Sequence, residues 1–165
     1  MAENIISQST IRDQFATGGD RLNAALQGLT EADLDCREAP GEWTIRQIVH
    51  HLADDGDAWS ECIKKAIATP GGFVRFEGFP GNEPWANALA YHLRPIEASL
   101  GLIQAHRRYL AALIDYFPNA WEQGIDLLDD QGNVAGHFSV GQMAKMLSDH
   151  FDDHIATIER IKAAR

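Results

Sequence analysis

The chain has 165 residues, of which 45% are apolar and 23% are charged, and its formal net charge is −10. This length suits one domain with a sizeable core, and the composition argues against disordered and collagen-like proteins. The negative charge argues against nucleic acid or an anionic membrane as the main partner, because both would repel the protein. We therefore expect a single domain over residues 1–165 that binds neither nucleic acid nor membranes.

The sequence contains no targeting segment that we recognise. Its first residues have no basic stretch followed by an apolar run, and no later segment approaches the roughly 18 apolar residues of a membrane span. Cys36 and Cys62 lack CxxC spacing, so we expect free thiols, with Cys62 in the core and Cys36 in an exposed turn. These features predict a soluble, cytoplasmic protein.

Apolar residues recur at helical spacing in four long segments. The first covers about residues 5–29 and has Gly18-Gly19 in its middle, where each glycine costs a helix roughly 1 kcal/mol. We expect one helix, weakened or kinked there; either tertiary packing overrides the loss or the chain breaks into two short helices. The second follows Thr44, and Gln47 stands where it completes a capping box. This pattern predicts a second helix over about residues 45–67.

The other two segments predict helices in the second half of the chain. Pro95 suits the first turn of a helix that runs to about residue 117, and Ser139 caps a last helix that ends near residue 164. Residues 125–137 place strong turn residues between short apolar runs, which predicts a short hairpin or an ordered loop. The expected fold is all-α, a four-helix bundle with this hairpin before the last helix.

Residues 69–85 are rich in glycine and proline and contain the aromatic residues Phe73, Phe76, Phe79 and Trp85. No regular element fits this composition. A long aromatic loop in a compact domain is uncommon unless it covers something, so the segment is a candidate lid or dimer contact. The alternative is an irregular loop whose rings plug the end of the bundle.

Two histidines in the last helix form a candidate metal-binding pair. His150 and His154 are four residues apart, so their side chains leave one face of the helix about one turn from each other. Both fall inside the apolar stripe that contains Phe151, so the helix would bury them. If another part of the chain supplies a third ligand, the pair is expected to bind a divalent metal. The alternative is two core histidines that each have a hydrogen-bond partner.

The second helix offers that third ligand. His51 lies at the edge of its apolar stripe, about 90° from the centre, whereas His50 points about 170° away and should face water. His51, His150 and His154 would meet if the second and fourth helices are neighbours. Three imidazoles leave coordination positions open, as in a catalytic site, and both zinc and nickel suit these ligands.

Candidates for a base lie elsewhere, because Phe151 stands where the HExxH motif of metalloproteases has its glutamate. Asp55 is one turn from His51 on the inner side of the helix and is a candidate to orient His51 or to accept a proton. Asp54, three residues from His51, could do the same, but its angle on the helix favours a solvated surface carboxylate. His106 is a candidate fourth ligand, base or substrate contact, with a hydrogen-bonded core histidine as the alternative.

Several familiar chemistries find no support in the sequence. It has no glycine-rich phosphate loop, no GxSxG elbow and no CxxC pair, which leaves nucleotide, flavin and redox-disulfide chemistry unsupported. The paired Glu-x-x-His motifs of carboxylate-bridged di-iron bundles are absent as well.

Three stretches together resemble the DinB/YfiT-like superfamily: residues 42–54 with the sequence EWTIRQIVHHLAD, residues 106–109 with HRRY, and His150-x-x-x-His154-Ile155. The resemblance implies a four-helix bundle, usually a homodimer, with nickel or zinc held by three histidines at one end. The matching positions are His51, His150 and His154. Members include S-transferases that use bacillithiol, isomerases that use mycothiol, and many candidate metal-dependent hydrolases.

One part of the last helix departs from that family pattern. Asp152, Asp153 and Thr157 stand where the closest YfiT-like members carry extra histidines. The sequence therefore leaves the subfamily open. Our hypothesis is an enzyme in which the metal activates water or a low-molecular-weight thiol toward a small electrophilic substrate. The alternatives are a non-catalytic metal-binding or stress-related interaction module, and a bundle without metal.

Overall fold

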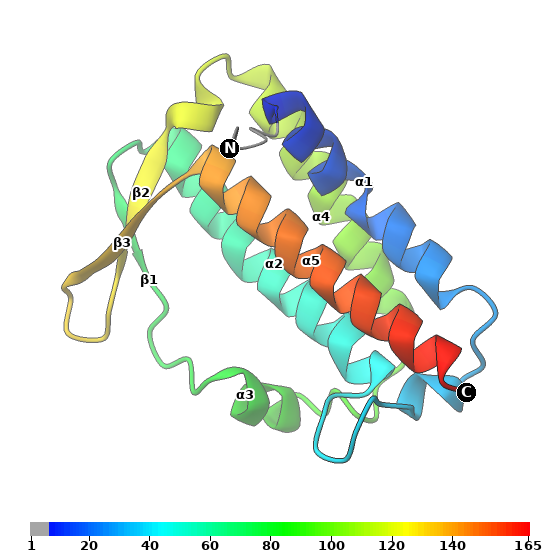
Figure 1. The fold of residues 1–165 in the computed structure, drawn as a ribbon. Coiled ribbons are helices and arrows are strands. Elements are labelled where there is room, and N and C mark those ends of the chain that lie inside the picture. Colours follow the sequence, from blue (N-terminus) through cyan, green and yellow to red (C-terminus); the bar gives the residue numbers. More distant parts are fainter. Residues whose placement is uncertain (1–6) are drawn as a thin grey trace, which may run out of the picture.

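The computed structural model describes residues 7–165 (Figure 1). Its helices are α1 Gln8–Leu26, α2 Ile45–Ala68, α3 Asn82–Ala88, α4 Glu97–Tyr116 and α5 Val140–Ala163, with 3-10 turns at Asp33–Asp35 and Ala120–Glu122. Its strands are β1 Phe73–Arg75, β2 Gly124–Leu128 and β3 Val134–Ser139. The predicted start of the first helix near residue 5 lies outside the described residues.

The four long helices form the predicted bundle. Helix α1 packs against α4 and α5, and α2 packs against the same two helices. Consecutive helices α1 and α2 are therefore diagonal to each other, while α2 and α5 lie side by side (Figure 1). This adjacency is the condition that the three-histidine hypothesis required. No helix in residues 7–165 is long and apolar enough to cross a membrane.

Capping boxes set the start of both helices that carry histidine candidates. The Thr44 hydroxyl accepts a hydrogen bond from the Gln47 backbone N–H at 3.2 Å, and the Gln47 side chain accepts one from the Thr44 N–H at 3.0 Å. Ser139 and Gln142 make the same pair of bonds at the start of α5. At the N-terminus of each helix, two backbone N–H groups that would otherwise lack a partner are hydrogen-bonded, so local sequence fixes where these helices begin.

Gly18 and Gly19 lie inside the single helix α1, as predicted, and the alternative of two short helices is wrong. Both glycines are buried against α4. A Cβ added at Gly18 would lie 2.6 Å from the guanidinium of Arg107, and one at Gly19 would lie 3.0 Å from the side chain of Gln104. The missing side chains let α4 approach closely, and that packing offsets the helix cost of glycine.

The two strands before the last helix join Phe73–Arg75 in a small sheet with the order β1-β2-β3. Strands β2 and β3 are the predicted hairpin, paired antiparallel. The prediction that residues 69–85 contain no regular element is wrong, because β1 pairs in parallel with β2 and α3 begins at Asn82. The edge of β2 supplies the hydrogen bonds of β1, a long-range pairing that local composition does not reveal.

The two cysteines pack into the bundle. Cys62 is fully buried, as predicted, in a core cluster with Ile63 and Leu110. The prediction of an exposed Cys36 is wrong, because its side chain is half-buried against a second cluster that includes Ile48. Its backbone explains this burial: the Cys36 carbonyl accepts a hydrogen bond from the Ile45 N–H at the start of α2.

Candidate metal centre

Three histidines meet between α2 and α5. His51 comes from α2, and His150 and His154 come from successive turns of α5. One nitrogen from each ring lies within 4.8 Å of the other two, and the Nε2 atoms of His51 and His150 are 3.0 Å apart. His51 is 7% exposed, while the two rings on α5 are half-buried. The structure thus brings together the three residues that the sequence singled out.

The environment of this cluster favours the neutral form of two of its rings, those of His51 and His154. Burial, followed by the charges of His154 and His150, lowers the pKa of His51 to about 3. Burial and then His150 lower the pKa of His154 to about 4. The edge of the Trp43 ring also packs on His51, with 4.8 Å between ring centroids. At neutral pH the imidazoles of His51 and His154 therefore carry the free nitrogen lone pairs that a metal ion requires.

His50 does not face water, and that prediction is wrong. It is 1% exposed, its Nδ1 lies 2.8 Å from the hydroxyl of Ser99, and its Nε2 lies 3.1 Å from the carbonyl oxygen of Arg94. The segment that leads into α4 and the first turn of α4 cover this face of α2, so the helix is buried on two sides here. With both ring nitrogens engaged, His50 has a structural role.

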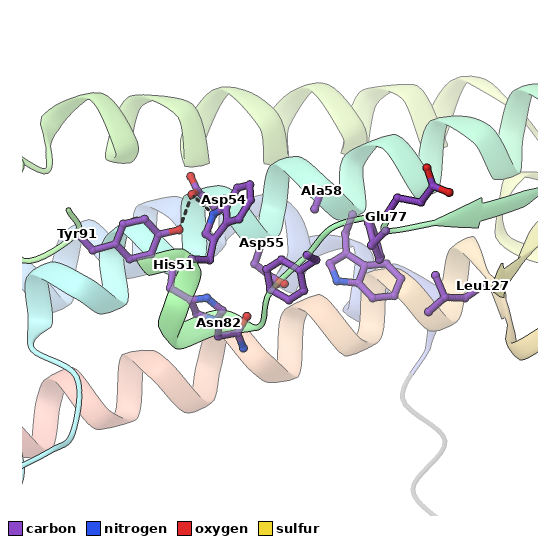
Figure 2. A pocket seen from close by; sticks show the side chains of 12 residues that line it. His51, Asp54, Asp55, Ala58, Glu77, Asn82, Tyr91 and Leu127 are labelled. Carbon is purple, nitrogen blue, oxygen red and sulfur yellow. Dashed lines mark hydrogen bonds between the residues drawn. The ribbon is translucent and has the colours of Figure 1, made fainter. Parts of the chain in front are cut away.

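Two carboxylates follow His51 on α2. Asp55 Oδ2 lies 3.8 Å from His150 Nε2, and burial raises the pKa of its carboxyl group. Asp54 is not a solvated surface group, contrary to the prediction. Its Oδ2 accepts hydrogen bonds from Trp85 Nε1 at 3.0 Å and from the Tyr91 hydroxyl, because α3 and the turn after it fold back over α2 (Figure 2).

His106 lies apart from this group. Its Nε2 is 3.6 Å from Asp57, its Nδ1 is buried without a hydrogen-bond partner in residues 7–165, and the ring borders a small gap beside Arg107 and Leu110. It does not line the cavity next to His51. His106 is therefore neither part of the three-histidine cluster nor part of the cavity lining.

A cavity of about 430 Å³ opens beside His51. Asp54, Asp55 and Tyr91 lie around it with His51, as Figure 2 shows. Its remaining walls are mainly apolar and come from α2, from residues 76–85 and from β2: Ala58, Trp59, Phe76, Glu77, Phe79, Asn82, Trp85 and Leu127.

Three of the four aromatic residues flagged in the 69–85 segment line this cavity, so the segment covers something, as its composition suggested. The fourth, Phe73, is 66% exposed. Sequence reasoning missed Tyr91, which is 1% exposed. Tyr91 falls between two predicted elements, so no local sequence pattern indicates its place in the cavity lining or its hydrogen bond to Asp54.

Comparison with known proteins identifies the family. The model of the DinB superfamily matches residues 14–158. The chain belongs to the DinB superfamily. This DinB-superfamily protein is 33% identical over 139 residues to a protein of Oceanobacillus iheyensis named "putative metal-dependent hydrolase", covering 83% of this chain and 75% of that protein. A protein of the same name from Bacillus pumilus is 29% identical over 135 residues, which cover 76% of this chain and 75% of that protein.

Solved structures show the same fold. YfiT from Bacillus subtilis, described as a probable metal-dependent hydrolase with an unusual four-helix bundle topology, aligns with a TM-score of 0.83 at 20% identity, covering 99% of this chain and 92% of its own. The colibactin self-resistance protein ClbS, solved in complex with a dsDNA, aligns with a TM-score of 0.65 at 16% identity over 98% of both chains. At these identities the two structures support the bundle topology alone.

Proposed function

We propose that this DinB-superfamily protein is an enzyme that holds one divalent metal ion, nickel or zinc, through His51, His150 and His154. One observation carries the proposal: three ring nitrogens from two helices lie within 4.8 Å of one another. Their donor chemistry fits such an ion, because the lowered pKa values of His51 and His154 keep those rings unprotonated near neutral pH. The relatives named for metal-dependent hydrolysis support the same reading.

The reaction that we propose is attack of water or of a low-molecular-weight thiol on a small electrophilic substrate. When bound, a divalent ion lowers the pKa of such a nucleophile and polarises the substrate. Asp55, 3.8 Å from His150 Nε2, is placed to hold that ring in position or to accept a proton. The Asp55→Asn variant keeps the shape of the side chain and should lose about 10- to 100-fold in activity.

A catalytic role is favoured over a purely metal-binding one by the cavity. A non-catalytic module needs no space beside its metal, whereas this cavity of about 430 Å³ has His51 in its wall. Its size suits a small molecule. The residues around it shield a bound substrate from water, which strengthens the electrostatic interactions inside the site.

Metal content tests the site. Elemental analysis of the untagged wild-type protein should find about one nickel or zinc ion per chain. The double variant His150→Ala/His154→Ala should contain none, while the control His92→Ala, an exposed histidine outside the cavity lining, should match wild type. Wild-type protein without stoichiometric metal, or full retention of metal in the double variant, would refute the site.

A second assay separates the two nucleophiles. Metal-loaded protein is incubated with an electrophilic ester or epoxide, with and without a low-molecular-weight thiol. Conversion that requires the thiol identifies a transferase, and conversion in its absence identifies a hydrolase. If neither occurs across a panel of substrates while the metal is bound, the non-catalytic module replaces the enzyme proposal.

Three expectations about the setting of the enzyme belong to the same proposal. We expect a homodimer, which sedimentation analysis tests, and a cytoplasmic location, which cell fractionation tests. The net charge of −10 also leads us to expect no binding of duplex DNA in an anisotropy titration at physiological salt.

A further inference from the structure

The walls of the cavity beside His51 are built from aromatic rings. Trp59 and Phe76 form an edge-to-face pair with centroids 5.9 Å apart, and Phe79 and Trp85 form a tilted pair 5.8 Å apart. Tyr91 adds a fifth ring to the lining. Phe79 and Trp85 are 48% and 39% exposed, so this pair stands at the rim, where it meets an incoming molecule.

The polar part of the same lining is acidic. Asp54, Asp55 and Glu77 contribute carboxyl groups, and no lysine or arginine in residues 7–165 lines the cavity. Arg75 forms an ion pair with Glu77. Asp54 and Asp55 are therefore the carboxyl groups of the lining that remain without a lysine or arginine partner there. Asp55 is beside the histidines.

Asp54 stands among the rings instead. Hydrogen bonds from Trp85 Nε1 and the Tyr91 hydroxyl fix its Oδ2, which places a negative charge at the aromatic wall. Aromatic faces attract cations electrostatically, and they do so more strongly when water is excluded. A carboxylate held against such rings adds to that attraction and repels anions.

We infer that the substrate is a small apolar molecule that carries a positively charged amine, with the amine held near Asp54 and against the Phe79–Trp85 pair. This inference rests on the proposed function, because it names the class of molecule on which the metal site acts. It also makes a negatively charged thiol a poor co-substrate.

Three probes of one shape test the inference. Benzyltrimethylammonium, neopentylbenzene and benzylsulfonate share a benzyl group and carry a positive, a neutral and a negative tetrahedral head. Quenching of intrinsic tryptophan fluorescence reports their binding, because two of the four tryptophans, Trp59 and Trp85, line the cavity. We expect the cation to bind at least about fivefold more tightly than the neutral probe, and the anion to bind most weakly. Equal affinity of the cation and the neutral probe, or tightest binding of the anion, would overturn the inference.

Two matched variants locate the selectivity. Asp54→Asn keeps an oxygen to accept the bonds from Trp85 and Tyr91 but removes the charge, so the cation's advantage should fall to less than about twofold. Asp57→Asn removes an exposed charge from the same helix, outside the cavity lining, and should leave the advantage unchanged. An unchanged advantage in Asp54→Asn would assign the selectivity elsewhere and refute the role of Asp54.

The same titrations separate this inference from the metal proposal. They are run on wild-type protein with and without zinc and on His150→Ala/His154→Ala. The aromatic pairs and Asp54 are outside the histidine cluster, so the double variant should keep the preference for the cation. If wild type binds zinc but shows no such preference, the inference fails while the metal proposal stands. If the preference for the cation is present but the wild-type protein binds no zinc, the metal proposal fails, and the cavity keeps its selectivity for cations without a role in metal-dependent chemistry.

Discussion

The two faces of α2 at His50 and His51 are both buried, yet they differ in what surrounds each ring. On the His50 face, the hydroxyl of Ser99 and the carbonyl of Arg94 engage both ring nitrogens. On the His51 face, the ring nitrogen meets two more imidazoles. Burial alone therefore does not mark a metal ligand. The distinguishing feature is whether ordinary hydrogen-bond partners already occupy the ring nitrogens.

The largest expected effect comes from removing the proposed metal ligand His51. His51→Ala should lower metal affinity and activity by at least about 100-fold, because even residues that only support a metal ligand cost 10- to 100-fold when mutated. Isothermal titration with zinc and a turnover assay measure the two losses. The neighbouring His50→Ala variant is the control, and equal loss of metal in both variants would abolish the distinction between the faces.

The next largest effect is expected in the pH dependence of the free energy of unfolding of the metal-free protein. The pKa values of His51 and His154 fall from 6.5 to about 3 and about 4 on folding. Below pH 6.5 the unfolded chain therefore binds protons that the folded chain does not, so the free energy of unfolding decreases as the pH falls toward 4. The limit is about 1.4 kcal/mol per pH unit for each histidine.

Urea unfolding at a series of pH values measures this dependence. The double variant His51→Ala/His154→Ala should show a flatter profile between pH 6.5 and 4. It should keep a residual slope, because burial also lowers the pKa of His50. A profile as steep as that of wild type would show that the cluster does not titrate as the structure implies.

Removing the ring on the other face should affect stability rather than metal. His50→Ala leaves the Arg94 carbonyl and the Ser99 hydroxyl without their partner, which should cost about 1–3 kcal/mol in the free energy of unfolding. Thermal unfolding of the metal-free variant measures the loss, and elemental analysis should still find the wild-type metal content. Loss of metal without loss of stability would contradict the structural role of His50.

The smallest effect is expected for Tyr91, whose side chain contacts both His50 and the carboxylate of Asp54 at the cavity. Tyr91 packs on His50, with 5.4 Å between ring centroids, and donates a hydrogen bond to Asp54 at the cavity. Tyr91→Phe keeps the ring and removes only the hydroxyl, so it should destabilise the fold by about 1 kcal/mol and leave the metal content unchanged. Chemical denaturation measures the change, and a loss above about 3 kcal/mol would mean that more than this bond is broken.

Much of the fold follows from local sequence. The Thr44 and Ser139 caps, the spacing of His150 and His154 and the turn residues of the hairpin each act within a few residues of one another. His51 could be selected as well, because its angle on α2 puts it at the edge of the apolar stripe. The family resemblance agreed with that choice, and the superfamily match confirms the family.

The rest depended on contacts between distant segments. The angle of His50 is measured against one apolar stripe, and a stripe cannot show that the segment before α4 covers the opposite face. Asp54 was misplaced for the same reason, since Trp85 and Tyr91 reach it from α3 and the turn beyond. The pairing of β1 with β2 joins segments about 50 residues apart, and local patterns carry no signal for such pairings.

X-ray absorption spectroscopy of the zinc-loaded protein tests the central claim most directly. The account predicts three imidazole nitrogens at about 2.0–2.1 Å and at least one further light-atom ligand that exchanges when an inhibitor or thiol is added. The His51→Ala sample should lose one imidazole from this shell, and His50→Ala should keep all three. A spectrum with sulfur from Cys36 or Cys62, or one that is unchanged in His51→Ala, would contradict the three-histidine site.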